Sequence, residues 1–100
     1  MAKIKHIALF KFKEGTSEEQ INDLFNGVLD LTENIEGIED YVSGANNSPE
    51  GLNQGYTHGF VMTLADAAAR DAYLVHPEHE KIMALILPLA ESVLAFDFEL

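Results

Sequence analysis

The chain of 100 residues carries 6 basic and 17 acidic side chains, which gives a formal net charge of −11 at pH 7. This acidic balance argues against nucleic acid and against an anionic membrane surface as partners, because both are bound by clustered cations. The absence of cysteine excludes disulfides, thiolate nucleophiles and metal–thiolate centres. We therefore expect one small domain, residues 1–100, and a cytoplasmic location, because the N-terminus lacks the apolar core of a signal peptide.

Residues 3–12 alternate with period two, which predicts a strand. One face of this strand carries Ile4, His6, Ala8, Phe10 and Phe12. Ile7 and Leu9 lie on the other face, so the strand is apolar on both sides and should be covered on both.

A helix is predicted over residues 18–35, because apolar residues recur there at helical spacing and Gly37 follows as a stop signal. Its capping box can be either of two pairs, Thr16 with Glu19 or Ser17 with Gln20. The remaining elements are read from alternation, caps and prolines: strands over 38–45 and 56–64, helices over 67–75 and 77–91, and a last strand over 92–100. Pro88 should kink or tighten the end of the last helix.

The order strand, helix, strand, strand, helix pair, strand predicts an α+β fold. It is the ferredoxin-like split βαβ arrangement, a four-stranded antiparallel sheet with helices on one face. Ile7, Leu9 and Val61 would then remain on an open sheet face. We expect a homodimer in which two such faces pack together into a dimeric α/β barrel.

The spacing Tyr73-x-x-His76-Pro77-x-His79 brings a phenol and two imidazoles into one short stretch. Histidine exchanges protons near neutral pH, and a tyrosine hydroxyl can donate a hydrogen bond to a developing oxyanion. In an apolar pocket, such groups could deprotonate a carbon next to a carbonyl without a cofactor.

Each of these residues also has a structural explanation. His6 and His58 on strands could be hydrogen-bonded core residues, Tyr73 could simply pack on the sheet, and His76 could cap the following helix. A metal at His76 and His79 is a weak alternative, because one His-x-x-His pair lacks the third and fourth ligands. We therefore expect no resident metal or cofactor.

Three segments and the chain end together carry a family resemblance: residues 4–13, 55–58, 71–79 and 96–98. They resemble the stress-responsive A/B barrel (dimeric α/β-barrel) domain family, over essentially the whole chain. The resemblance implies a ferredoxin-like fold that dimerises through its sheets. It further implies the residue roles of a polyketide cyclase in that family, which performs an intramolecular aldol condensation without metal or cofactor.

Carried over, His79 would be the base and Tyr73 would hold and orient the carbonyl oxygen. His6 and His58 would bind substrate in a cavity between sheet and helices. Three hypotheses stay open: a dimeric domain of unassigned reaction with a small-molecule cavity, a cofactor-independent cyclase or lyase acting on a small apolar carbonyl compound, and a cofactor-independent monooxygenase with the same fold. The absence of tryptophan disfavours the haem-degrading form of the third.

Overall fold

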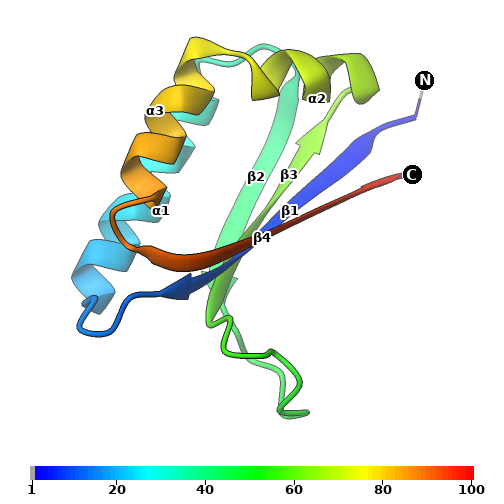
Figure 1. The fold of residues 1–100 in the computed structure, drawn as a ribbon. Coiled ribbons are helices and arrows are strands. Elements are labelled where there is room, and N and C mark those ends of the chain that lie inside the picture. Colours follow the sequence, from blue (N-terminus) through cyan, green and yellow to red (C-terminus); the bar gives the residue numbers. More distant parts are fainter. Residues whose placement is uncertain (1) are drawn as a thin grey trace.

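The computed structural model describes residues 2–100 and contains four strands and three helices within that range (Figure 1). In chain order the elements are β1 (Ile4–Phe12), α1 (Glu18–Thr32), β2 (Ile38–Ala45), β3 (His58–Leu64), α2 (Ala67–Leu74), α3 (Pro77–Ile86) and β4 (Ala90–Glu99). None of these helices is long and apolar enough to cross a membrane.

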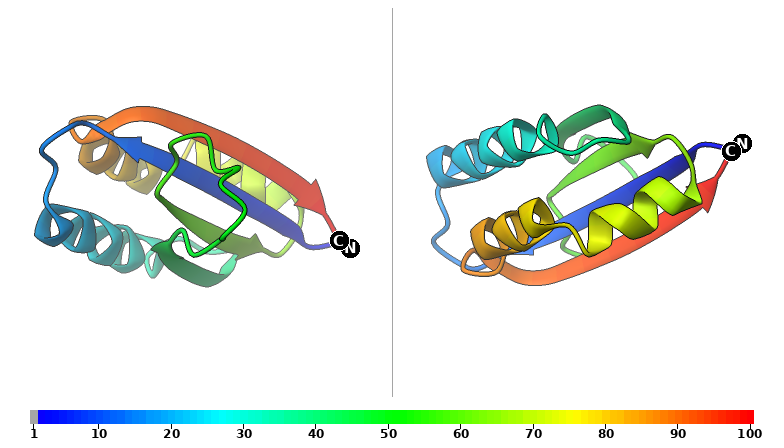
Figure 2. Two further views of the ribbon diagram at one scale, coloured as in Figure 1. Left: turned by 90° about the horizontal axis from the view of Figure 1, so that it is seen from below. Right: turned by 90° about the horizontal axis from the view of Figure 1, so that it is seen from above.

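The four strands form one antiparallel sheet in the order β2-β3-β1-β4. All three helices cover the same face, as Figures 1 and 2 show. This confirms the ferredoxin-like split βαβ fold. In the pairing of β1 with β3, His6 lies opposite Met62 and His58 lies opposite Phe10.

Side-chain caps begin each helix. Ser17, not Thr16, forms the capping box with Gln20, and Asp66 accepts a hydrogen bond from the Ala69 amide at the start of α2. His76 caps α3 as expected, with Nδ1 accepting from the Glu78 amide at 3.0 Å. This cap matters for function, because it sets the angle at which α3 leaves α2.

Two predicted helix ends and two predicted strand starts differ from the structure by two to five residues. Helix α1 ends at Thr32 rather than at residue 35, because the next turn tightens: Asn34 and Ile35 donate to carbonyls three residues earlier, at 3.1 Å each. Helix α3 ends at Ile86 rather than at residue 91, because Pro88 supplies no amide hydrogen to continue the helical hydrogen bonds. Strand β4 consequently begins at residue 90, and β3 begins at residue 58 instead of 56.

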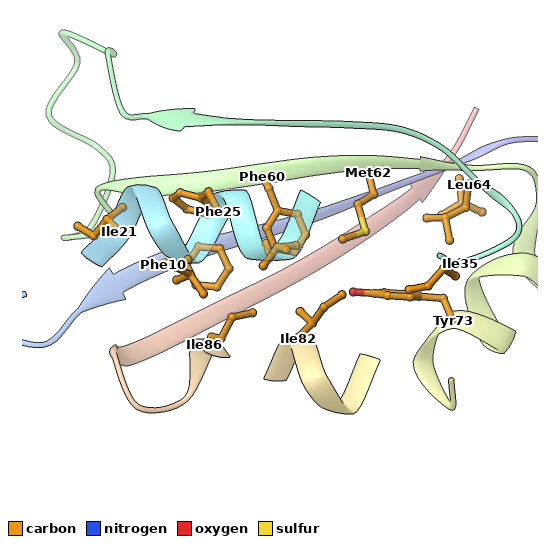
Figure 3. Close-up of a cluster of buried hydrophobic side chains, with 14 residues drawn as sticks. Phe10, Ile21, Phe25, Ile35, Phe60, Met62, Leu64, Tyr73, Ile82 and Ile86 are labelled. Carbon is orange, nitrogen blue, oxygen red and sulfur yellow. The ribbon is translucent and has the colours of Figure 1, made fainter. Parts of the chain in front are cut away.

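The core lies between the sheet and the helices (Figure 3). Its largest fully buried side chains come from every layer: Phe10, Val28, Met62, Leu64, Tyr73 and Ile82. Aromatic rings stack along it, with Phe10 in contact with both Phe25 and Phe60 at centroid distances of 5.7 and 5.5 Å. The side of the sheet that bears His6 is therefore well packed.

The opposite face of the sheet is left open by the helices, as predicted. One cross-strand row on this face consists of Phe96, Ile7, Val61 and Val42. Phe96 is 60% exposed and Val42 is 54% exposed. Large apolar side chains in one exposed row are typical of surfaces that interact with another molecule.

Gly37 gives a first testable prediction, because it joins α1 to β2 with a positive φ of +96°. A methyl group there would also lie 2.9 Å from the Ala69 side chain of α2. We expect Gly37→Ala to destabilise the fold by roughly 1–3 kcal/mol. The control is Gly15→Ala, which has a similar φ of +85° but open space around it. Urea unfolding at matched protein concentration should show a larger loss in the free energy of unfolding for Gly37→Ala than for Gly15→Ala. Equal losses would show that the clash with Ala69 of α2 adds nothing to the cost of the positive φ.

Candidate active site

His6 contacts an acidic side chain on the neighbouring strand, β4. It lies directly opposite Asp97 in the β1–β4 pairing, and its Nδ1 is 2.5 Å from Asp97 Oδ1. The His6 side chain is buried, and its ring contacts the edge of Tyr73 at a centroid distance of 5.7 Å. This places one imidazole of the predicted set against the predicted phenol.

Tyr73 and His79 meet because α2 and α3 are joined by the sharp turn at His76. Their rings are nearly perpendicular at 78°, with centroids 4.8 Å apart. Tyr73 is only 1% exposed, and Figure 3 shows its hydroxyl directed toward the middle of the core near Ile82. The structure thus brings His6, Tyr73 and His79 together.

The Tyr73 hydroxyl is a donor without a protein acceptor. Among residues 2–100, every side-chain nitrogen or oxygen that is fully sealed from solvent has a hydrogen-bond partner. Tyr73 forms no such bond within that range, so its hydroxyl is not completely sealed, although the residue is only 1% exposed. Burial, with smaller contributions from Tyr41 and Asp97, raises the Tyr73 pKa well above its usual value, so the group stays protonated.

Tyr41, a residue that the sequence analysis did not select, lies close enough to influence Tyr73. Burial raises the pKa of Tyr41 to about 12. Its hydroxyl donates to the Phe25 carbonyl at 3.3 Å, so it is already engaged. Tyr73 is therefore the phenol of this pair that can donate to a ligand.

His79 is suited to act as a base. Burial lowers its pKa from the ordinary value of 6.5, and the nearby His6 lowers it further, against opposing contributions from Glu80 and the Leu74 backbone. The ring is therefore neutral at pH 7 and can accept a proton. The His79 ring is only partly buried, so part of it is accessible to solvent.

The lowered pKa of His79 gives a second prediction. Because the folded protein binds this proton less readily than the unfolded chain, His79 should cost stability as the pH falls from about 7 through the folded pKa. His79→Asn removes this titrating group. As the pH falls, the free energy of unfolding should therefore decrease less for the variant than for the wild-type protein. Urea unfolding of both proteins between pH 7.5 and 5 measures this difference. If the two free energies of unfolding change with pH in parallel, the lowered pKa of His79 is contradicted.

His58 does not join the other three residues. Its Nδ1 is 2.8 Å from the Thr57 hydroxyl, its Nε2 lies 3.7 Å from a Glu18 carboxylate oxygen, and its ring packs on Phe12 and Phe25. It is separated from His6 along the sheet by the Phe60 ring, which itself contacts His6. His58 therefore does not contact the other three residues, and its role in binding substrate stays a prediction.

The position of the expected cavity also differs. A hollow of about 610 Å³ lies on the open face of the sheet, bordered by Ile7, Leu9, Val61 and Leu94, with Leu52 from the loop over residues 46–57. It exists because Gly44 and Gly59 pair across β2 and β3 and project no side chains. Between the sheet and the helices, the space around Tyr73 is largely filled by the core. Of the four predicted site residues, only His58 borders this hollow.

Asp97 and Arg70 are site residues that the sequence analysis missed. Asp97 could have been noticed as the one acid within the alternating run of residues 94–98, on the side opposite Phe96. Its partner could not be named without the register of β1 and β4. Arg70 carries no signal of this kind, since a single arginine on a helix is ordinary.

The structure therefore defines a ferredoxin-like α+β domain with a buried cluster of two histidines and a tyrosine. It belongs to the stress-responsive A/B barrel domain family, whose model matches residues 4–100. This confirms the resemblance drawn from the sequence.

Relatives support the same placement. The chain is 35% identical over 96 residues to the stress-response A/B barrel domain-containing protein HS1 of Arabidopsis thaliana, covering 96% of this chain and 88% of that protein. It is 26% identical over 95 residues to olivetolic acid cyclase of Cannabis sativa, covering 95% and 94%. A crystal structure of a dimeric ferredoxin-like protein of unknown function from Thermobifida fusca superposes with a TM-score of 0.81 at 29% identity, covering 99% of this chain and 92% of that one.

Proposed function

We propose that this protein is a homodimeric A/B barrel that carries a cofactor-independent acid–base site in each protomer. The dimer is supported by the open apolar face of the sheet, whose central row runs from Phe96 to Val42. The structural relative from Thermobifida fusca, which is described as dimeric, supports the same assembly. Two such faces packed together would complete the barrel.

One observation carries the catalytic proposal: a protonated tyrosine hydroxyl without a protein acceptor lies beside a neutral, partly accessible imidazole. The pair supplies an oxyanion donor and a base at the same point. An apolar surround favours this chemistry, because charge that develops there is stabilised by few, fixed donors. Olivetolic acid cyclase, a relative across nearly the whole chain, is a cyclase by name.

We assign the steps as follows for a small apolar substrate with two carbonyl groups. A ring nitrogen of His79 removes a proton from the carbon next to one carbonyl, and Tyr73 donates a hydrogen bond to the enolate oxygen that forms. The enolate carbon bonds to the second carbonyl carbon of the same molecule. The resulting alkoxide takes the proton back from His79, so the enzyme returns to its starting state and the product is an aldol.

The first half of this reaction can be tested without knowing the natural substrate. We would incubate the protein in D₂O with medium-chain methyl ketones and 3-oxo esters and follow loss of the proton next to the carbonyl by NMR. The expected result is exchange faster than that caused by free imidazole at the same concentration. Exchange at the imidazole rate with every probe, alongside tight binding of one of them, would instead support a non-catalytic ligand-binding domain.

A further inference from the structure

A charged chain runs from the surface of α2 to the cluster. Arg70 Nη1 lies 3.1 Å from Asp97 Oδ2, while the other oxygen of the same carboxylate contacts His6 Nδ1 at 2.5 Å. Both oxygens of Asp97 are therefore engaged, one by each neighbour. Arg70 and Tyr73 are three residues apart on α2, so one helical face presents both to the sheet.

The contact with Asp97 determines where His6 carries its proton. An ionised carboxylate only accepts hydrogen bonds, so His6 Nδ1 must donate. In the neutral ring this leaves Nε2 without a proton, as an acceptor. His6 can then receive a hydrogen bond from a ligand, which the opposite tautomer could not do through the same nitrogen.

Arg70 has two contacts of very different character. Its Nε donates to Asp71 at 2.8 Å, but Asp71 is mostly exposed, and an ion pair of adjacent residues at the surface contributes little. Its Nη1 reaches Asp97, whose side chain is largely shielded. The inner contact with Asp97 is therefore the one that connects Arg70 to the cluster.

From this geometry we infer that Arg70 is a positioning residue of the acid–base site, acting through Asp97 to hold His6 in the Nδ1–H tautomer. The inference rests on the proposed function for its significance, because a fixed acceptor at His6 Nε2 matters only if a ligand enters beside Tyr73. The statement that Arg70 on α2 fixes the tautomer of His6 does not depend on whether the protein catalyses a reaction. Arg70 itself touches neither Tyr73 nor His79 in the described contacts.

The test is the tautomer of His6, measured by long-range ¹H–¹⁵N NMR on histidine-labelled protein at neutral pH without ligand. The wild-type protein should show predominantly Nδ1–H. Asp97→Ala should shift His6 toward Nε2–H, the tautomer that free imidazole side chains favour. Arg70→Met, which keeps the apolar stem, should at least halve the share of Nδ1–H, and Arg70→Lys should restore part of it.

Lys81→Met is the matched control, because it removes a cation of the same charge from a surface pair with Glu78. It should leave the His6 signals unchanged. A wild-type-like spectrum for Arg70→Met would overturn the inference, even if that variant melts at a lower temperature, since a structural role alone lowers stability without moving the tautomer. An unchanged spectrum for Asp97→Ala would overturn it as well. If Arg70→Met does not fold, Arg70→Gln decides, as it keeps a donor and loses the charge.

Failure of the proposed function is distinguished by a separate measurement. If wild-type protein causes no deuterium exchange while the tautomer shifts as expected, the catalytic assignment fails and the positioning chain remains. If exchange is observed but Arg70→Met leaves both its rate and the His6 tautomer unchanged, the site is confirmed and Arg70 is not part of it.

Discussion

Replacing Phe96 by aspartate should convert the protein from a dimer into a monomer at micromolar concentration. Phe96 is 60% exposed in the single chain and lies in the central row of the open sheet face. A second copy packed on this face would bury the new carboxylate without a partner. Such a buried, unpaired charge costs about 3–5 kcal/mol, which raises the dissociation constant roughly 150- to 5,000-fold.

Light scattering after size exclusion, across a dilution series, measures this effect. Val75→Asp is the matched control, because Val75 is 83% exposed at the end of α2, away from the sheet face, and should leave the mass of the particle unchanged. Circular dichroism should show both variants folded, since neither side chain belongs to the core. A Phe96→Asp protein that keeps the mass of two chains would place the interface elsewhere.

The fold was predictable because its signals are local. Alternation within 3–12 and 56–64 indicates which residues share a face of the sheet, and His6 and Met62 do lie on the same face. Caps such as Ser17 and His76 act within a few residues of their own position. The errors occur where a helix end depends on a competing effect, as at Pro88, where the loss of an amide hydrogen outweighs an apolar run that continues to residue 90.

The candidate site was less predictable because it is assembled by pairings between distant elements. Tyr73 and His79 are near in sequence, and their meeting follows from one turn. The contact between His6 and Asp97 spans 91 residues and depends on the register of β1 with β4. His58 lies on the same sheet face as His6 without contacting it, because the two strand positions are far apart and the Phe60 ring packs against His6.

These observations separate the roles of the two faces of the sheet. The face under the helices holds the titratable cluster, in which a partly buried carboxylate, an imidazole and a phenol contact one another across β1, β4 and α2. The open face carries apolar side chains and a hollow formed by paired glycines. We therefore expect substitutions on the open face to change dimerisation and substitutions on the face under the helices to change catalysis, each with little effect on the other property.

Tyr73→Phe and His79→Asn should each lower the rate of enzyme-catalysed deuterium exchange while leaving the protein folded. Loss of the base should cost about 10²–10⁴-fold, and loss of the oxyanion donor about 10²–10³-fold. Tyr73→Phe is the more revealing change, because the Tyr73 hydroxyl has no hydrogen-bond partner within residues 2–100. Its removal should alter the free energy of unfolding by less than about 1 kcal/mol.

Tyr56→Phe provides the control for the loss of a phenol. Its hydroxyl lies 3.0 Å from the Ser92 hydroxyl, outside the cluster, so exchange should continue at the wild-type rate. The rates come from NMR time courses with a single ketone probe, and the stabilities from urea unfolding. If Tyr73→Phe destabilises the protein strongly and leaves exchange unchanged, the hydroxyl serves the core and not the reaction, and His79 would then have to act without an oxyanion donor from α2.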